Sequence, residues 1–160
     1  MRILAVSLFI VSAAPAFAAD KDDDKAKQVA TAFLKGLKEK DLDAMMKVAD
    51  VPSIADIGPN PKTIEKREEL KEAMAKLIET AKPEKVMALE VGKGYDMAGL
   101  AKYAKDNGGG EETEKFIARA EKFVGKDGRM VMLVRRNGKE GMGFLIRFRD
   151  GKALIASVPE

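Results

Sequence analysis

The chain has 160 residues, of which 29 are basic and 26 acidic, and it contains neither Cys nor His. The missing thiols and imidazoles exclude disulfides, Cys-based nucleophilic catalysis and soft-metal sites. A net charge of only +3 does not provide the broad basic field that attracts a polyanion, which argues against nucleic-acid binding.

Residues 1–18 have the layout of a secretory signal peptide. Arg2 lies beside the amino terminus, a mostly apolar run extends from Ile3 to Ala14, and Ala16 and Ala18 are small residues two apart. The run is shorter than the roughly 20 residues of a membrane span, and no Cys follows it for lipid attachment. We expect cleavage after Ala18 and a periplasmic or secreted bacterial protein that is neither a lipoprotein nor membrane-bound. The net charge then becomes +2, because Arg2 is the one charged residue removed.

The 142 residues that remain are enough for a single domain with a hydrophobic core. The acidic segment 19–25 is predicted to be a flexible tail. Its Asp spacing lacks the Gly and the final Glu of a calcium loop, so we predict no metal site there. The folded domain is therefore expected to span residues 26–160.

Apolar residues three and four positions apart predict helices over 26–37 and 70–81. Asp41 is suited to cap a short helix over 42–48, with Pro52 as its stop. Strands are predicted at 53–57, 62–65 and 85–92, the first two joined by a turn at 58–61. Two more helices are expected at 97–105 and 111–124, with Gly125 closing the second.

Two-residue turns at 137–138 and 150–151 predict consecutive hairpins in the C-terminal quarter, because Asn-Gly and Asp-Gly tolerate positive φ. The expected cross-strand pairs are Arg136 with Lys139, Leu133 with Met142, Val131 with Phe144, Arg149 with Lys152, Phe148 with Ala153, and Ile146 with Ile155.

This register gives the hairpins one almost entirely apolar face, which we expect to pack under the helices. It consists of Val131, Leu133, Met142, Phe144, Ile146, Phe148, Ala153 and Ile155. The aromatic residues on it point away from the arginines, whereas a stacking platform for single-stranded nucleic acid needs both on one surface. The separation of aromatic residues and arginines is therefore a second argument against nucleic-acid binding.

The opposite face also has an apolar centre, edged by Arg147. Its apolar residues are Met130, Met132, Val134, Leu145 and Leu154. A sheet that faces water seldom gathers five such side chains. Either the 97–124 helices or a second copy of the protein should cover them, and we slightly favour a homodimer contact through this surface.

The order of elements, including the segments KDLDAMMKVAD and KREELKEAMAKLIE, resembles the nuclear transport factor 2-like superfamily. This group includes the ketosteroid isomerases and the SnoaL-like polyketide cyclases. The resemblance covers about residues 26–92 and 129–158, and residues 93–128 would be a helical insertion. It implies an α+β fold in which N-terminal helices pack on a curled antiparallel sheet, a cystatin-like cone around a pocket, often as a dimer.

By this resemblance Asp56 takes the place of the isomerases' general base, and Phe33 replaces their hydrogen-bond-donating tyrosine. Tyr95 and Tyr103 are the chain's two phenols, and both fall in the insertion. The implied pocket residues are Phe33, Asp56, Tyr95 and Tyr103. Without an aligned donor or any His, we expect a non-catalytic domain that binds a small apolar ligand or a protein partner, with no cofactor. The alternative is an isomerase- or cyclase-like enzyme with Asp56 as its base.

Overall fold

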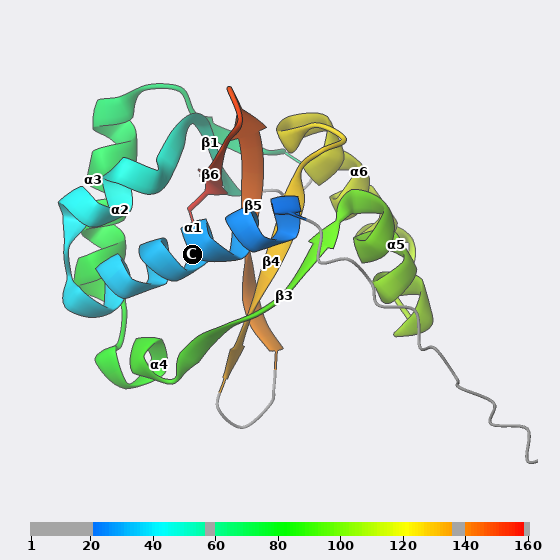
Figure 1. Ribbon diagram of the computed structural model, residues 1–160, viewed down its shortest axis with the longest axis horizontal. Coiled ribbons are helices and arrows are strands. Elements are labelled where there is room, and N and C mark those ends of the chain that lie inside the picture. Colours follow the sequence, from blue (N-terminus) through cyan, green and yellow to red (C-terminus); the bar gives the residue numbers. More distant parts are fainter. Residues whose placement is uncertain (1–20, 57–59, 136–139, 159–160) are drawn as a thin grey trace, which may run out of the picture.

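The computed structural model describes residues 21–56, 60–135 and 140–158, with the backbone alone for residues 56 and 140–142. The expected signal peptide lies outside these ranges, as do the side chains of Asp56 and Met142. The described chain forms six helices and a six-stranded sheet, which confirms the predicted α+β class (Figure 1). None of the described helices combines the length and the apolar character needed to cross a membrane.

The helices are α1 (Lys21–Glu39), α2 (Leu42–Val48), α3 (Arg67–Thr80), α4 (Pro83–Met87), α5 (Met97–Asp106) and α6 (Glu111–Val124). The strands are β1 (Ala49–Asp56), β2 (Lys62–Ile64), β3 (Leu89–Asp96), β4 (Arg129–Arg135), β5 (Glu140–Arg149) and β6 (Lys152–Ser157). The strands lie side by side in the order β2-β1-β6-β5-β4-β3. Neighbours are antiparallel except β1 and β6, which run parallel.

The first helix begins earlier than predicted, so residues 21–25 of the expected acidic tail form its first turn. Asp22, Asp23 and Asp24 lie at the helix N-terminus, where negative charge interacts favourably with the helix dipole. Asp23 also accepts a hydrogen bond from Nε of Arg129 on β4, at 2.9 Å. This ion pair joins the start of α1 to the sheet.

The short second helix has the predicted cap, because the Asp41 carboxylate accepts a hydrogen bond from the Ala44 backbone N–H at 2.9 Å. The following strand, however, begins at Ala49 rather than at Ser53, so Pro52 lies inside β1. The pairing of β1 with β6 is irregular between Ala49 and Ile54. A proline without an N–H fits such an interruption of the ladder.

The strand predicted at 85–92 is shifted by four residues. Pro83 is suited to the first turn of a helix, and α4 occupies residues 83–87 before β3 begins at Leu89. Since β3 continues to Asp96, the sheet also takes up the first residues of the expected insertion. The insertion proper consists of α5 and α6, with Gly125 at φ 85° closing α6 as predicted.

The C-terminal hairpins have the predicted register at every pair that the structure describes except near the first turn. Val131 lies opposite Phe144, Phe148 opposite Ala153 and Ile146 opposite Ile155. A bulge between Met132 and Val134 shifts the pairing by one residue toward the first turn, so that Val134 lies opposite Glu140. The turn at 136–139 lies outside the described residues.

The main core lies between the sheet and α1, which crosses the strands in Figure 1 with α2 and α3 at one side. Phe33 of α1 meets Phe144 of β5 edge to face, with ring centroids 5.0 Å apart. A smaller apolar cluster lies on the other face of the sheet, under α5 and α6. It contains Ile54, Met97, Ala120, Val124, Leu145 and Ala156, with Phe123 and Met130 packed against it.

Candidate functional site

The candidate binding site is a groove of about 640 Å³ between α3 and the edge of the sheet formed by β1 and β2. Its volume falls in the range of roughly 300–1,000 Å³ that is usual for small-molecule sites. The lining residues are Ala55, Lys62, Thr63, Ile64, Glu69, Glu72, Ala73, Lys76, Leu77, Thr80 and Val158. The apolar members come from α3, β1, β2 and the segment after β6.

The sequence of α3 explains why this space stays open. Helical spacing places one stripe, Leu70 and Met74, in the core. The neighbouring stripe, at 69, 72, 73, 76, 77 and 80, faces the groove. This stripe includes the small side chain of Ala73, which leaves room that a larger residue would fill.

The basic and acidic side chains that line the groove differ in how many of them form ion pairs. Lys66, which does not line the groove, lies 3.4 Å from the Glu69 carboxylate. Within the described residues, Lys62, Lys76 and Glu72 form no ion pair. Counted over the described side chains, the groove lining therefore has two ammonium groups and one carboxylate that form no ion pair, which favours an anionic group at its rim.

A buried hydroxyl lies directly behind the groove. Ser53 is opposite Ile64 in the β1–β2 pairing and two residues before Ala55, and both of those residues line the groove. Its Oγ is fully buried and has no hydrogen-bond partner among the residues that the structure describes. Most buried polar groups are paired, so an unpaired hydroxyl at this point lowers the free energy of unfolding.

A second, smaller hollow of about 210 Å³ lies on the other side of the sheet. It is lined by Ile54, Ala55, Phe116, Met130, Gly143, Leu145, Ser157 and Val158. The Ser157 hydroxyl already accepts a hydrogen bond from the Leu145 backbone N–H at 3.0 Å. The lining therefore offers mainly apolar surface.

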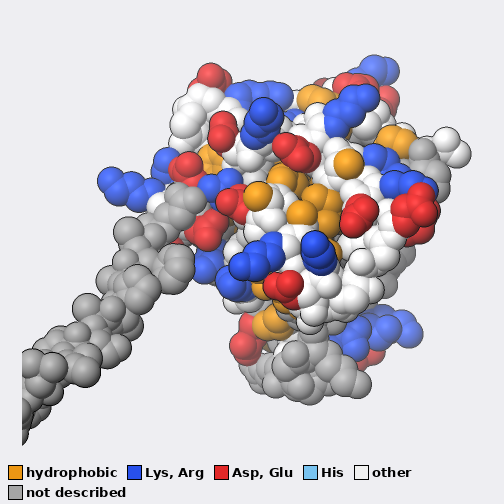
Figure 2. Space-filling model, turned by 90° about the vertical axis from the view of Figure 1, so that its right-hand side faces the viewer, with side chains coloured by type: hydrophobic (Ala, Val, Ile, Leu, Met, Phe, Trp, Pro, Cys, Tyr) orange, Lys and Arg blue, Asp and Glu red, His pale blue; other side chains and the backbone are white. Residues whose placement is uncertain are grey.

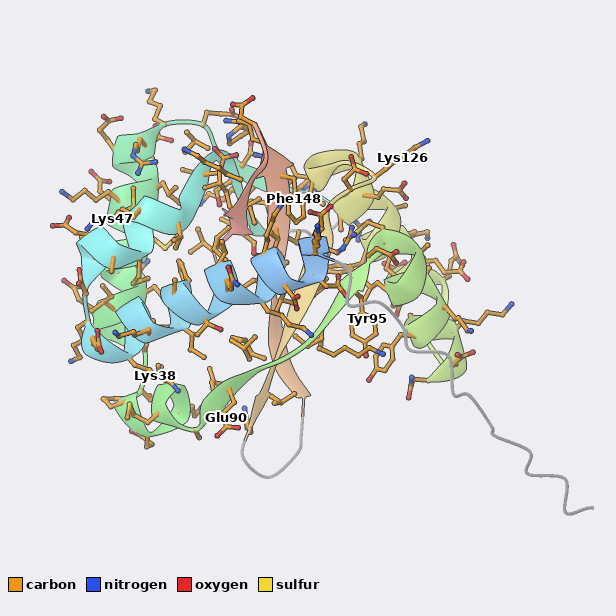
Figure 3. All side chains as sticks on the ribbon, in the orientation of Figure 1. Lys38, Lys47, Glu90, Tyr95, Lys126 and Phe148 are labelled. Atoms are coloured by element: carbon orange, nitrogen blue, oxygen red, sulfur yellow. The ribbon has the colours of Figure 1, made fainter. Side chains whose placement is uncertain are left out.

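The four predicted pocket residues do not form one cluster. Phe33 is entirely buried in the main core. Tyr95 of β3 and Tyr103 of α5 contact each other at 5.0 Å between ring centroids, and Figure 3 shows Tyr95 on the opposite side of the molecule from α3. Asp56 ends β1, and three strands separate β1 from β3, a distance of about 19 Å along the sheet. Its cross-strand neighbour Lys62 lines the groove, so the Asp56 backbone lies at the groove edge.

The predicted partner surface divides into a covered part and a half-exposed part. Leu145 is buried under the insertion helices and the half-buried Met130 packs against the same cluster, whereas Met132, Val134 and Leu154 are half-exposed outside it. Figure 2 shows hydrophobic side chains at the centre of the face on the α5 and α6 side, with charged side chains around them. Homodimerisation through the remaining apolar area stays a prediction, which light scattering at micromolar protein concentration would test.

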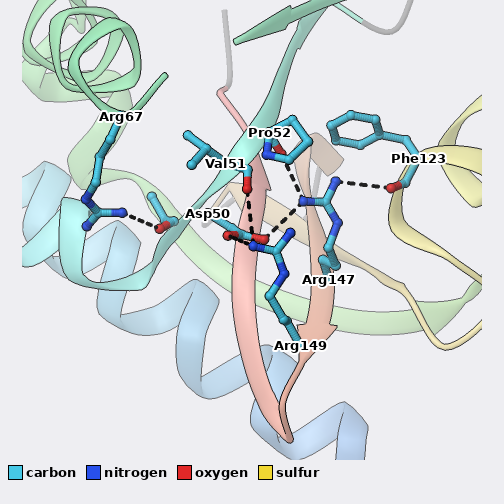
Figure 4. A network of polar contacts seen from close by, with 8 residues as sticks. Asp50, Val51, Pro52, Arg67, Phe123, Arg147 and Arg149 are labelled. Carbon is cyan, nitrogen blue, oxygen red and sulfur yellow. Dashed lines mark hydrogen bonds and ion pairs between the residues drawn. The ribbon is translucent and has the colours of Figure 1, made fainter. Parts of the chain in front are cut away.

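Arg147, predicted at the edge of that surface, is buried in a polar network (Figure 4). Its guanidinium donates to the Asp50 carboxylate at 3.0 Å and to the Pro52 carbonyl at 2.9 Å. It also donates to the Phe123 carbonyl at 3.1 Å, in the last turn of α6, where helix carbonyls lack intrahelical partners. Arg149 binds the other Asp50 oxygen at 3.0 Å.

This network joins β5, β1 and α6, and no local sequence pattern indicates it. Asp50 stands between two apolar residues, in the short segment between the helix predicted at 42–48 and the strand predicted at 53–57, far along the chain from Arg147. A buried carboxylate next to two arginines is well paired, which makes the network a structural connection. Within the described residues, no group of three or more acidic side chains is placed to hold a metal ion.

No protein-family model and no curated protein matches the chain. Among solved structures, a substituted variant of a designed nuclear transport factor 2-like protein is similar at 16% sequence identity. The match covers 86% of this chain and 96% of that chain, with a TM-score of 0.43. At this sequence identity and TM-score, the similarity identifies neither a ligand nor an activity for this chain.

Proposed function

We propose that this protein is an exported, non-catalytic binding domain whose groove between α3 and the β1–β2 edge holds a small ligand with an apolar body. The observation that carries the proposal is the groove itself, with about 640 Å³ of space over an apolar floor. Sites of this kind combine apolar walls with a few polar groups that orient the ligand. Here the polar groups are Lys62, Lys76 and Glu72 and the hydroxyl groups of Thr63 and Thr80.

The non-catalytic part of the proposal is supported by the scarcity of acid–base groups near the groove. The chain has no His or Cys. Its two phenols, Tyr95 of β3 and Tyr103 of α5, contact each other at the other edge of the sheet from the groove. A proton-transfer enzyme of the isomerase type needs both a base and a donor for the developing oxyanion within reach of one substrate.

Substitution of a groove residue tests the proposal. Ala73→Phe places a ring in the floor of the groove, and Lys71→Phe places the same ring at an exposed α3 position outside the lining. We expect titration calorimetry with octyl glucoside, below its micelle concentration, to show saturable binding to the wild type and to Lys71→Phe. Ala73→Phe should lose at least tenfold in affinity. Equal affinities of all three proteins, or no saturable binding to the wild type, would overturn the proposal.

Export is tested separately from binding. The full chain, expressed in a bacterial host, should appear in the periplasm with a mass that corresponds to cleavage after Ala18. An uncleaved chain that stays with the membrane fraction would contradict it.

The alternative function is an isomerase- or cyclase-like enzyme, and the observation in its favour is that the neighbours of Asp56 line the groove. A carboxylate at the edge of an apolar site can serve as a general base. If this function holds, a β,γ-unsaturated ketone should be isomerised by the wild type and not by Asp56→Asn, with both proteins equally folded. No turnover by the wild type would exclude this substrate class.

A further inference from the structure

The groove and the smaller hollow across the sheet meet at the same two residues. Ala55 and Val158 line both spaces. A hydrogen bond of 2.9 Å from the Val158 backbone N–H to the Ile54 carbonyl holds the two segments together at this point. The two spaces therefore adjoin at one end of the β1–β6 pair, one on the α3 side of the sheet and one on the α6 side.

The smaller hollow owes one wall to the insertion. Phe116 of α6 faces Met130, Gly143 and Leu145 of the sheet across it. At about 30 Å³ per water molecule, 210 Å³ has room for roughly seven groups the size of a water or a methylene. Its lining is mainly apolar, so a hydrocarbon segment suits it better than a polar one.

The groove, in contrast to the apolar hollow, has side chains suited to the charged head group of an amphiphilic ligand. Lys62 and Lys76 have no ion-pair partner in the described chain, and Lys66 neutralises Glu69. An anionic group in the groove would gain charge-assisted hydrogen bonds from the two ammonium groups. A ligand with its charge in the groove and its chain over Ala55 and Val158 would match both spaces at once.

We infer that the ligand is a single-chain anionic amphiphile, such as a fatty acid, whose head group lies in the α3 groove and whose chain end lies in the hollow under Phe116. This inference rests on the proposed function, because it names the ligand class of the same groove. The insertion helices then have a role in binding as well as in covering the sheet.

A series of alkanoates from 6 to 14 carbons, titrated below their micelle concentrations, tests the chain position. Each methylene that becomes buried should strengthen binding about fourfold. A Cβ at position 143 would lie 2.5 Å from the Met130 Cε, so Gly143→Val should push the flexible end of the Met130 side chain into the hollow. Less of the ligand chain then fits, and affinity should stop rising at a shorter alkanoate than in the wild type. Met132→Val is the matched control, on the same sheet face but outside both spaces. Identical chain-length profiles for all three proteins would overturn the inference.

A nitroxide-labelled fatty acid gives a test that needs no variant in the hollow. With the nitroxide near the chain end, the amide signals of Phe116 and Gly143 should broaden more than those of Leu77 and Thr80. With the nitroxide near the carboxylate, the order should reverse. Broadening of the α3 amides by both labels would place the whole chain in the groove and contradict the inference.

The charge of the head group is tested with two lysine variants and a cationic ligand. Lys76→Gln should weaken decanoate binding about two- to fivefold, and Lys71→Gln, outside the lining, should leave it unchanged. Decyltrimethylammonium should bind more weakly than decanoate. If the cation binds as strongly as decanoate or more strongly, the inference is overturned and the proposed function still stands. If no amphiphile binds, octyl glucoside included, the result contradicts the proposed function itself.

Discussion

The two faces of the sheet are stabilised in different ways, and neighbouring residues of β5 show the contrast. Phe144 points into the main core, where it meets Phe33 and the apolar stripes of α1, α2 and α3. Leu145 points to the opposite face, into the small cluster under α5 and α6. Next to that cluster, the buried Arg147 binds Asp50 of β1 and the Phe123 carbonyl of α6, and so connects the insertion to β1. Apolar packing dominates one face, and a few apolar contacts with one polar network hold the other.

Truncation of the two β5 neighbours should reveal this contrast most strongly. We expect Phe144→Ala to lower the free energy of unfolding by about 4 kcal/mol, because it leaves a cavity against Phe33. Leu145→Ala should cost about 2 kcal/mol, because its cluster is smaller and α6 can move toward the gap. Urea unfolding of both variants measures the two values, and equal losses would show that the faces contribute alike.

The arginines of the network provide the second comparison. The side chain of Arg147 is 11% exposed and that of Arg149 is 47% exposed, although both bind Asp50. Arg147→Ala leaves the Pro52 and Phe123 carbonyls without this donor and removes one partner of a buried carboxylate, so we expect a loss of about 3 kcal/mol.

Arg149→Ala serves as the matched variant, since it removes a contact that water can replace. Its expected cost is below about 1 kcal/mol. Hydrogen exchange should show faster exchange of the α6 amides in Arg147→Ala and no change in Arg149→Ala. If the two variants lose the same stability, Arg147 does not anchor the insertion.

The smallest expected effect has the opposite sign. Ser53→Ala removes a buried hydroxyl that has no hydrogen-bond partner in the described part of the chain, so the free energy of unfolding should stay equal or rise by up to about 1 kcal/mol. Thermal unfolding of the variant measures this change. A loss above about 1 kcal/mol would mean that the hydroxyl is paired in solution, for example with a water molecule.

Local sequence patterns predicted most of the elements, because turns, caps and apolar periodicity are local. Asp41 caps α2, Gly125 closes α6, and the Asp150–Gly151 turn fixes the register of the last hairpin. Pro83 begins α4, a short helix that overlaps the start of the strand predicted at 85–92. The bulge between Met132 and Val134 was not predicted from the sequence.

The groove was less predictable than the fold, because it depends on elements that are distant in the chain. The prediction of a ligand site drew on Phe33, Asp56, Tyr95 and Tyr103, but the strand order places the tyrosines at the opposite edge from Asp56. The groove residues of α3, such as Ala73 and Leu77, belong to a stripe that looks like ordinary core. Only the packing of Val158 and β2 beside α3 shows that this stripe is left partly uncovered.

Mapping of a bound ligand by NMR tests the central claim most directly. Octyl glucoside, whose chain is small beside a groove of about 640 Å³, should produce saturable shifts at the amides of Ala55, Thr63, Ala73, Leu77 and Val158. The amides of α1 in the main core should stay unchanged. Shifts that do not saturate, or that gather on α1 or β3 instead of the groove, would contradict the claim that this protein binds its ligand between α3 and the β1–β2 edge.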